Sequence, residues 1–232
     1  MPTVIKNLPS WLRRDRLRVE LGAALHLQVS PSMIRDYALP DYVRLKRLGP
    51  KPLRRLLGID LFYRFVRSRA PLVLPGDWDL HATPVAETPT HRFIAELVAA
   101  GYDYRATAAY ARMIAEIDSG KAIRHKKSII DSRDKVEAHF AYYCGVCRSM
   151  AADGYRRESA RDPLCVMIGR HGNIVKEEKG RHRLAVAQLV GVPMIPVWVR
   201  HIHPLWVEEL RRTFPGSAAE AIRAGLQRLD IS

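Results

Sequence analysis

Three stretches between residues 88 and 155 repeat apolar positions at the three- and four-residue spacing of an α-helix. The clearest stretch starts near Ser132 and stops at Gly154, with an apolar stripe of Val136, Phe140, Tyr143, Cys147 and Met150. Two shorter helices are expected from Thr90 to Ala100 and from Arg105 to Ser119, ending at Gly101 and Gly120. Their predicted buried faces are Ile94, Leu97 and Val98 in the first, and Ala108, Ala111, Ile114 and Ile117 in the second. We therefore expect residues 88–155 to be helical throughout.

The pattern changes from residue 162 onward to short β-rich runs separated by turns. Residues 164–169 and 174–176 predict a hairpin across the turn at 171–173, and 194–200 predicts a further strand. A helix is expected at 182–190, and two helices close the chain, the second opened by a capping box of Ser217 and Glu220. The order β-β-α-β-α-α predicts an α+β fold, a small mixed sheet with packed helices, preceded by a helical region.

Prolines and glycines divide the chain into three expected regions. Residues 1–75 form a basic, proline-punctuated N-terminal region of short helices and turns. Residues 76–155 form the helical region, which opens on a hinge at 75–80, and residues 156–232 form the α+β domain.

Composition favours a globular protein of a reducing compartment. Of the 232 residues 47% are hydrophobic, and no run approaches the ~20 apolar residues of a membrane span. The first nine residues lack the apolar segment of a secretion signal, and three cysteines do not suit a disulfide framework. We expect a cytoplasmic location.

Positive charge is concentrated at the start of the chain. The net charge is +14, and residues 1–70 hold fifteen Lys and Arg against five Asp and Glu, an excess of ten positive charges. Such a field attracts a polyanion, namely nucleic acid, an anionic membrane surface or an acidic glycan, although a well-solvated basic surface has the same composition. Residues 44–69 interleave the charges with apolar positions, as in a basic amphipathic helix that lies on a membrane or packs on the protein.

The most informative motif is the run Gly180, Arg181, His182 and Arg183 at the start of a predicted helix. The first backbone amides of a helix have no partner within it, and the helix dipole there favours negative charge. Gly180 allows a close approach of the backbone to a ligand, and Arg181 and Arg183 add fork-shaped donors that match phosphate oxygens. The run predicts a phosphate-binding cradle, with a solvated helix start as the alternative.

A longer pattern around this cradle resembles the ParB/sulfiredoxin superfamily, and most closely an uncharacterised branch of it. The pattern consists of residues 166–174, Gly180 to Ala187, Gly191, residues 195–197 and residues 203–206. A looser likeness extends to residues 76–79, Gly101 and Gly154. Sulfiredoxins carry a cysteine where this chain has Arg181, so the resemblance does not imply sulfinic acid repair. ParB proteins bind CTP and DNA, but too few residues follow residue 206 for their helix-turn-helix domain.

Other members of the superfamily are small-molecule kinases, and they suggest roles for further residues. Their basic motif holds the nucleotide phosphates and a nearby glutamate acts as general base, which implies Glu177 or Glu178 as base or Mg²⁺ ligand. The acid usually found directly before the glycine is Lys179 here, so that carboxylate is not carried over. Candidate catalytic residues are Glu177, Glu178 and His182, and candidate nucleotide-binding residues are Gly180, Arg181, His182, Arg183, Arg200 and His203.

Asp77, Trp78 and Asp79 in the hinge allow two interpretations. They could supply accessory acids and a platform on which a base stacks, or they could form a plain hinge with Trp78 buried. Cys144 and Cys147 have metal-like spacing, but no second pair follows, so we expect both in the core and no metal site.

The sequence therefore predicts a nucleotide-binding protein that acts as a phosphotransferase or nucleotide hydrolase with ATP or CTP and Mg²⁺. The alternative is a DNA-binding or nucleic-acid-processing protein of ParB type, which the basic N-terminal region favours.

Overall fold

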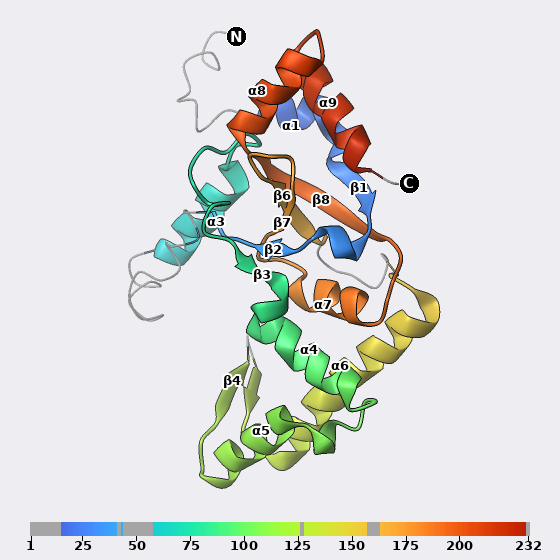
Figure 1. Cartoon of the computed structure of the whole chain (residues 1–232). Helices are drawn as coiled ribbons and strands as arrows, with labels where there is room; N and C mark the ends of the chain where they lie inside the picture. The colour runs from blue at the N-terminus through green and yellow to red at the C-terminus, as the bar shows by residue number, and fades with distance from the viewer. Residues whose placement is uncertain (1–14, 41–42, 44–57, 126–127, 157–162, 231–232) are drawn as a thin grey trace.

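A computed structural model describes residues 15–40, 43, 58–125, 128–156 and 163–230. The described chain is α+β, as predicted, and its centre is a mixed sheet in the order β1-β8-β6-β7-β2-β3 (Figure 1). The strands are β1 (His26–Val29), β2 (Asp36–Tyr37), β3 (Thr83–Pro84), β6 (Cys165–Ile168), β7 (Ile174–Lys176) and β8 (Ile195–Ile202). Strand β6 pairs in parallel with β8 and antiparallel with β7, and β2 runs parallel to β7.

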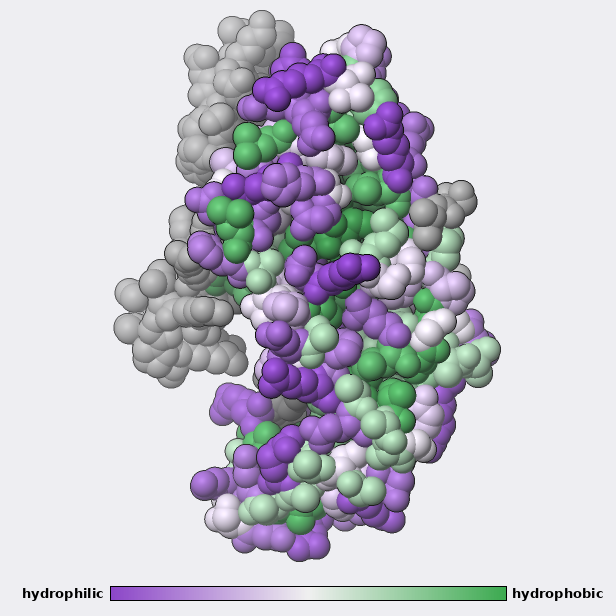
Figure 2. Space-filling view, viewed as in Figure 1, coloured by the Kyte–Doolittle hydropathy of each residue, from purple (hydrophilic) through white to green (hydrophobic). Residues whose placement is uncertain are grey.

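Helices lie at both ends of the sheet. The described helices are α1 (Arg16–Leu21), α3 (Ile59–Arg69), α4 (Pro89–Ala99), α5 (Ala108–Asp118), α6 (Arg133–Asp153), α7 (Arg181–Leu189), α8 (Pro204–Thr213) and α9 (Ala218–Leu229). Helices α1, α8 and α9 gather at one end of the molecule, whereas α4, α5 and α6 extend from the other end beyond α7 (Figure 1). Polar residues are spread over the whole visible face, from α8 to α5 (Figure 2).

The helices whose apolar residues repeat most regularly in the sequence have nearly the bounds and buried residues that the sequence predicts. Helix α6 is capped by the Ser132 side chain and ends at Gly154, and it buries all five residues of the predicted stripe together with Cys144. Helix α4 is capped by Thr88 and buries Ile94 and Leu97. The capping box of Ser217 and Glu220 opens α9, and the hairpin, helix and strand order of residues 164–202 is confirmed. Cys144 and Cys147 lie in the core, as expected.

Four expectations are wrong in detail. Residues 1–75 were expected to form only short helices and turns, but β1 and β2 belong to the central sheet and pair with β8 and β7. Residues 88–155 are not helical throughout, because β4 (Ile123–His125) and β5 (Ser128–Ile130) form a small hairpin. Helix α5 starts three residues later than expected, after a 3₁₀ turn at Tyr104–Ala106. It buries Ala109, while Ala108 and Ala111 are exposed.

The sheet has two unlike faces. Alternate residues of the central strands, such as Val166, Val197 and Val199, join the main core with Leu184 and Val186 of α7. On the opposite face Met167 and Val175 form a smaller cluster with Ala38 and Trp78. Because strand side chains alternate between faces, this division determines which residues can face α7 and which cannot.

The end of β8 anchors the chain that follows α3. The amide of Ile202 donates to the carbonyl of Leu72, and Val73 forms a β-bridge with Ile202. His201 is fully buried, and its Nδ1 lies 2.7 Å from the carbonyl oxygen of Pro71. A carbonyl only accepts, so Nδ1 carries the hydrogen. Burial lowers the pKa of His201 to about 3, and the ring is neutral in the folded protein.

Acid is expected to destabilise the protein through His201. The group has a pKa near 6.5 when unfolded and about 3 when folded, so below pH 6.5 the unfolded state binds the extra proton. Between pH 7.5 and 5 this difference removes about 2 kcal/mol of the free energy of unfolding. The control is His201→Asn, which keeps an N–H donor near Nδ1 but does not titrate. In urea denaturation, wild type should lose about 2 kcal/mol more than the variant over this pH range; equal losses would contradict the prediction.

Candidate functional site

The predicted cradle lies where β7 passes through a short loop into α7. Gly180 precedes the helix with a left-handed backbone (φ 86°). A Cβ at this position would come within 3.0 Å of the side chain and 3.1 Å of the Cα of Leu164. The glycine is therefore required by backbone conformation and by packing on Leu164, and close approach of the backbone to a ligand stays a prediction. It offers no side chain to cap the first amides of α7, which remain a positive helix end.

Strand β2 brings an aromatic residue to this helix start. Tyr37 is in register with Lys176, and the amide of Ala38 donates to the Lys176 carbonyl. The guanidinium of Arg181 lies 5.4 Å from the centroid of the Tyr37 ring, and its Nη1 is 3.5 Å from the Tyr37 hydroxyl. The carboxyl ends of two parallel strands and the start of α7 thus meet at one edge, the usual place for a ligand in α/β sheets.

The residues of the motif point in different directions from the helix start. Arg181 lies toward β2, whereas His182 stacks on Tyr143 of α6, with ring centroids 4.9 Å apart. Arg183 donates from Nη1 to the hydroxyl of Tyr155 at 2.7 Å. His182 is therefore held by packing against α6, and the two arginines stand on either side of the first turn.

Lys176 is a buried cation beneath the loop, and the sequence analysis did not select it. Its Nζ donates to the carbonyls of Cys165, Glu177 and Lys179. Three acceptors match the three donors of an ammonium group, so they favour the charged form. Burial lowers the pKa of Lys176 to about 7, with Arg181 among the charges that act in the same direction. When protonated, Lys176 adds positive charge beneath the start of α7.

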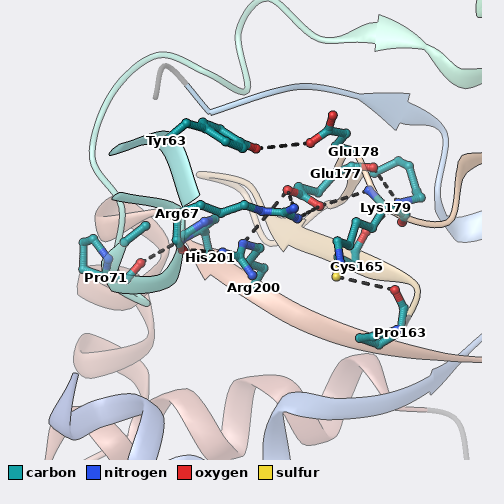
Figure 3. A network of polar contacts seen from close by, with 12 residues as sticks. Tyr63, Arg67, Pro71, Pro163, Cys165, Glu177, Glu178, Lys179, Arg200 and His201 are labelled. Carbon is teal, nitrogen blue, oxygen red and sulfur yellow. Dashed lines mark hydrogen bonds and ion pairs between the residues drawn. The ribbon is translucent and has the colours of Figure 1, made fainter. Parts of the chain in front are cut away.

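The two neighbouring glutamates have unlike surroundings (Figure 3). Glu177 is fully buried, and its Oε1 forms an ion pair with Arg67 of α3 at 3.1 Å. Arg200 of β8 lies 4.0 Å from the same oxygen, and the amide of Lys179 donates to Oε2 at 3.1 Å. Glu178 is only half-buried and accepts from the Tyr63 hydroxyl at 3.3 Å. Glu178 is thus the accessible carboxylate, and Glu177 holds the loop in place.

Tyr63 takes part in this network as a hydrogen-bond donor. Burial, followed by the nearby charge of Glu178, raises the pKa of Tyr63 to about 12. The phenol therefore keeps its proton at neutral pH and donates a hydrogen bond to Glu178.

The hinge residues form a separate cluster at the other end of the β6–β7 hairpin. Arg170, in the hairpin turn, donates from its backbone amide and side chain to Asp79, and from Nη2 to Asp77 at 2.9 Å. Burial raises the pKa of Asp79, but the hydrogen bonds from Arg170 outweigh it and hold that pKa below its usual value. Asp77 and Asp79 therefore clamp the hinge to the hairpin turn, and Asp77 and Trp78 also line a cavity with Tyr37 of β2.

Trp78 and His203 complete this clamp. Trp78 is buried, as the hinge interpretation expected, and its indole donates to the carbonyl of Leu74. His203 accepts the amide of Leu205 on Nδ1 and lies 2.9 Å from the Gly76 carbonyl through Nε2. Since the amide only donates and the carbonyl only accepts, Nδ1 accepts and Nε2 donates. His203 caps α8 and fixes the hinge, away from the predicted nucleotide site.

Much of the basic N-terminal region lies outside the described residues, including 44–57 of the expected amphipathic helix. Two of its described cations are directed inward: Arg18 donates to the carbonyl of Arg200, and Arg67 pairs with Glu177. Binding of a polyanion by this region stays a prediction. Among the described residues, no helix has both the length and the apolar character needed to cross a bilayer.

Fold and site together define an α+β protein with a mixed sheet and a cationic helix start at the carboxyl ends of β2 and β7. No protein-family model, no curated protein and no solved structure matches the chain.

Proposed function

We propose that the protein is a nucleotide-binding protein of the ParB/sulfiredoxin type that transfers or hydrolyses a nucleotide phosphate. The observation that carries the proposal is the start of α7, where Gly180 leaves the first amides without a side-chain cap, Arg181 and Arg183 stand on either side of the first turn, and Lys176 is buried beneath the loop. Amides and guanidinium groups in this arrangement bind phosphate oxygens and stabilise charge that develops on them.

Glu178 is the carboxylate best suited to the chemistry. It is adjacent to the cradle and half-buried, and it accepts a hydrogen bond from the neutral hydroxyl of Tyr63. Glu177 is fixed by Arg67 and the amide of Lys179, which removes it from the role of general base.

Mg²⁺ fits such a site as a companion of the nucleotide. Within the part of the chain that the structure describes, no three His, Cys, Asp or Glu side chains group closely enough to hold a metal alone. Mg²⁺ takes most of its ligands from phosphates and water and needs one or two carboxylates, here Glu178.

The test is the thermal stability of the purified protein with ATP, ADP, CTP or GTP, each with and without Mg²⁺. A nucleotide at ~100 times its dissociation constant should add about 2.7 kcal/mol to the free energy of unfolding. Selective stabilisation by one nucleotide supports the proposal and names the donor for an acceptor screen. Stabilisation by short duplex DNA alone, lost at moderate salt, would replace the proposal with a DNA-binding function.

A further inference from the structure

A cavity of about 530 Å³ lies beside the network of Figure 3, between α3 and the strands β6 and β8. Tyr63 and Arg67 of α3 line one side, Trp198 and Arg200 of β8 line another, and Lys179 of the loop lies at its edge. Its volume falls within the range of ~300–1,000 Å³ typical of small-molecule sites.

The charges that line the cavity select an anion. Three of its lining residues are cationic, Arg67, Lys179 and Arg200, and two carboxylates lie close by: Glu177, fully buried behind Arg67, and the half-buried Glu178, which accepts from Tyr63. The side chains of Arg67 and Arg200 are only 15% and 12% exposed. A charge with so little water around it acts more strongly on a ligand than one on the open surface.

Aromatic rings in the same cavity suit a planar ligand. Trp198 is half-buried, and the guanidinium groups of Arg200 and Arg18 lie 5.8 and 5.7 Å from its ring centroid. Tyr63 adds a second ring from α3. Aromatic and guanidinium surfaces of this kind stack on nucleobases without selecting one strongly.

The cavity is distinct from the helix-start site because it lies on the other face of the sheet. Val166, Val197 and Val199 face the main core beneath α7, and the alternate residues Cys165 and Trp198 line the cavity. The loop between the two sites is pinned at Lys179, whose amide donates to Glu177 and whose carbonyl accepts from Lys176.

From this geometry we propose that the cavity is a second binding site, for a small phosphate monoester that carries a planar ring, such as a nucleoside monophosphate. The phosphate is held by Arg67, Lys179 and Arg200, and the ring lies against Trp198. The proposal is independent of nucleotide binding at α7.

The test is titration of the full chain with AMP, adenosine and inorganic phosphate, followed by calorimetry and tryptophan fluorescence. AMP should bind and quench part of the emission of the four tryptophans, adenosine should bind at least tenfold more weakly, and inorganic phosphate should compete with AMP. Trp198→Phe should remove the quenching. Lys179→Glu should weaken AMP binding about tenfold or more, because one attraction becomes a repulsion while the backbone contacts of residue 179 remain.

Two control variants separate this site from its surroundings. Lys121→Glu makes the same charge change at an exposed turn, and Arg181→Ala disables the helix start; both should leave AMP affinity within about twofold. No saturable AMP binding at millimolar concentration, or an unchanged affinity in Lys179→Glu, would overturn the proposal. If Arg181→Ala weakens AMP binding as much as Lys179→Glu does, the AMP site is at the start of α7 instead.

Discussion

Replacing Glu177 with glutamine is expected to lower the free energy of unfolding by about 3–5 kcal/mol, the usual cost of removing one partner from a buried ion pair. The carboxylate is fully buried, and its charge balances the guanidinium of Arg67 at 3.1 Å and faces Arg200 at 4.0 Å. Glutamine keeps the shape of the side chain and one acceptor oxygen. It leaves the guanidinium groups of Arg67 and Arg200 in the low-dielectric interior without a negative charge beside them. Urea denaturation at pH 7 measures the change.

The neighbouring residue supplies the matched control. Glu178→Gln makes the same substitution one position later, at a half-buried carboxylate that accepts from the Tyr63 hydroxyl, and should cost at most about 1 kcal/mol. If both variants remain as stable as the wild type and only Glu177→Gln loses turnover, Glu177 is the base after all, and our assignment of the two glutamates is reversed.

Local sequence was sufficient to predict elements that carry their own signals. Helix α6 has a long apolar stripe between a serine cap and a glycine stop, and α9 has a capping box, so their bounds follow from nearby residues alone. Strand β2 has only two residues, Asp36 and Tyr37, and neither is buried; pairing with β7 and β3 makes it a strand. Such a strand exists because of tertiary contacts, which no local pattern encodes.

The error in α5 has a different cause. Its alanines repeat at several helical spacings, so Ala108, Ala109 and Ala111 give no unique apolar face. The structure selects Ala109 because Tyr104 and Tyr110 pack on Phe140 of α6 and orient the helix.

The sequence predicted only those site residues that are neighbours along the chain. Residues 180–183 form a helix start, as expected, because glycine and the following apolar period are local signals. Arg67 and Glu177 are 110 positions apart, and Arg170 and Asp79 are 91 apart, so their pairing could not be found in one sequence. Lys176 did carry a signal, a lone cation that ends the apolar strand Ile174-Val175, although hydropathy alone does not distinguish a buried lysine from an exposed one.

The contacts of the loop explain why its residues play different parts. Glu177 and Lys179 connect it to Arg67 on one face of the sheet, and Lys176 supports it from the other through three carbonyls. A loop fixed from both faces holds the first amides of α7 in place before a ligand arrives, so little ordering entropy is lost on binding. Arg181 is not part of this framework, and its removal therefore tests ligand binding separately from folding.

Arg181→Ala is expected to weaken nucleotide binding about 100-fold, the loss for one or two charge-assisted hydrogen bonds to phosphate. The melting temperature should fall by only a few degrees, because the described contacts of Arg181 are a cation–π contact with Tyr37 and a long hydrogen bond to its hydroxyl. Calorimetric titration with the nucleotide that stabilises the wild type measures the affinity, and a thermal scan without ligand measures the stability.

Arg92→Ala is the matched control, since Arg92 is an exposed arginine in the first turns of α4, and it should change neither quantity. A large drop in melting temperature for Arg181→Ala would mark Arg181 as a structural residue. An unchanged nucleotide affinity would show that Arg181 does not contact the nucleotide. The main support for nucleotide binding at α7 would then be lost.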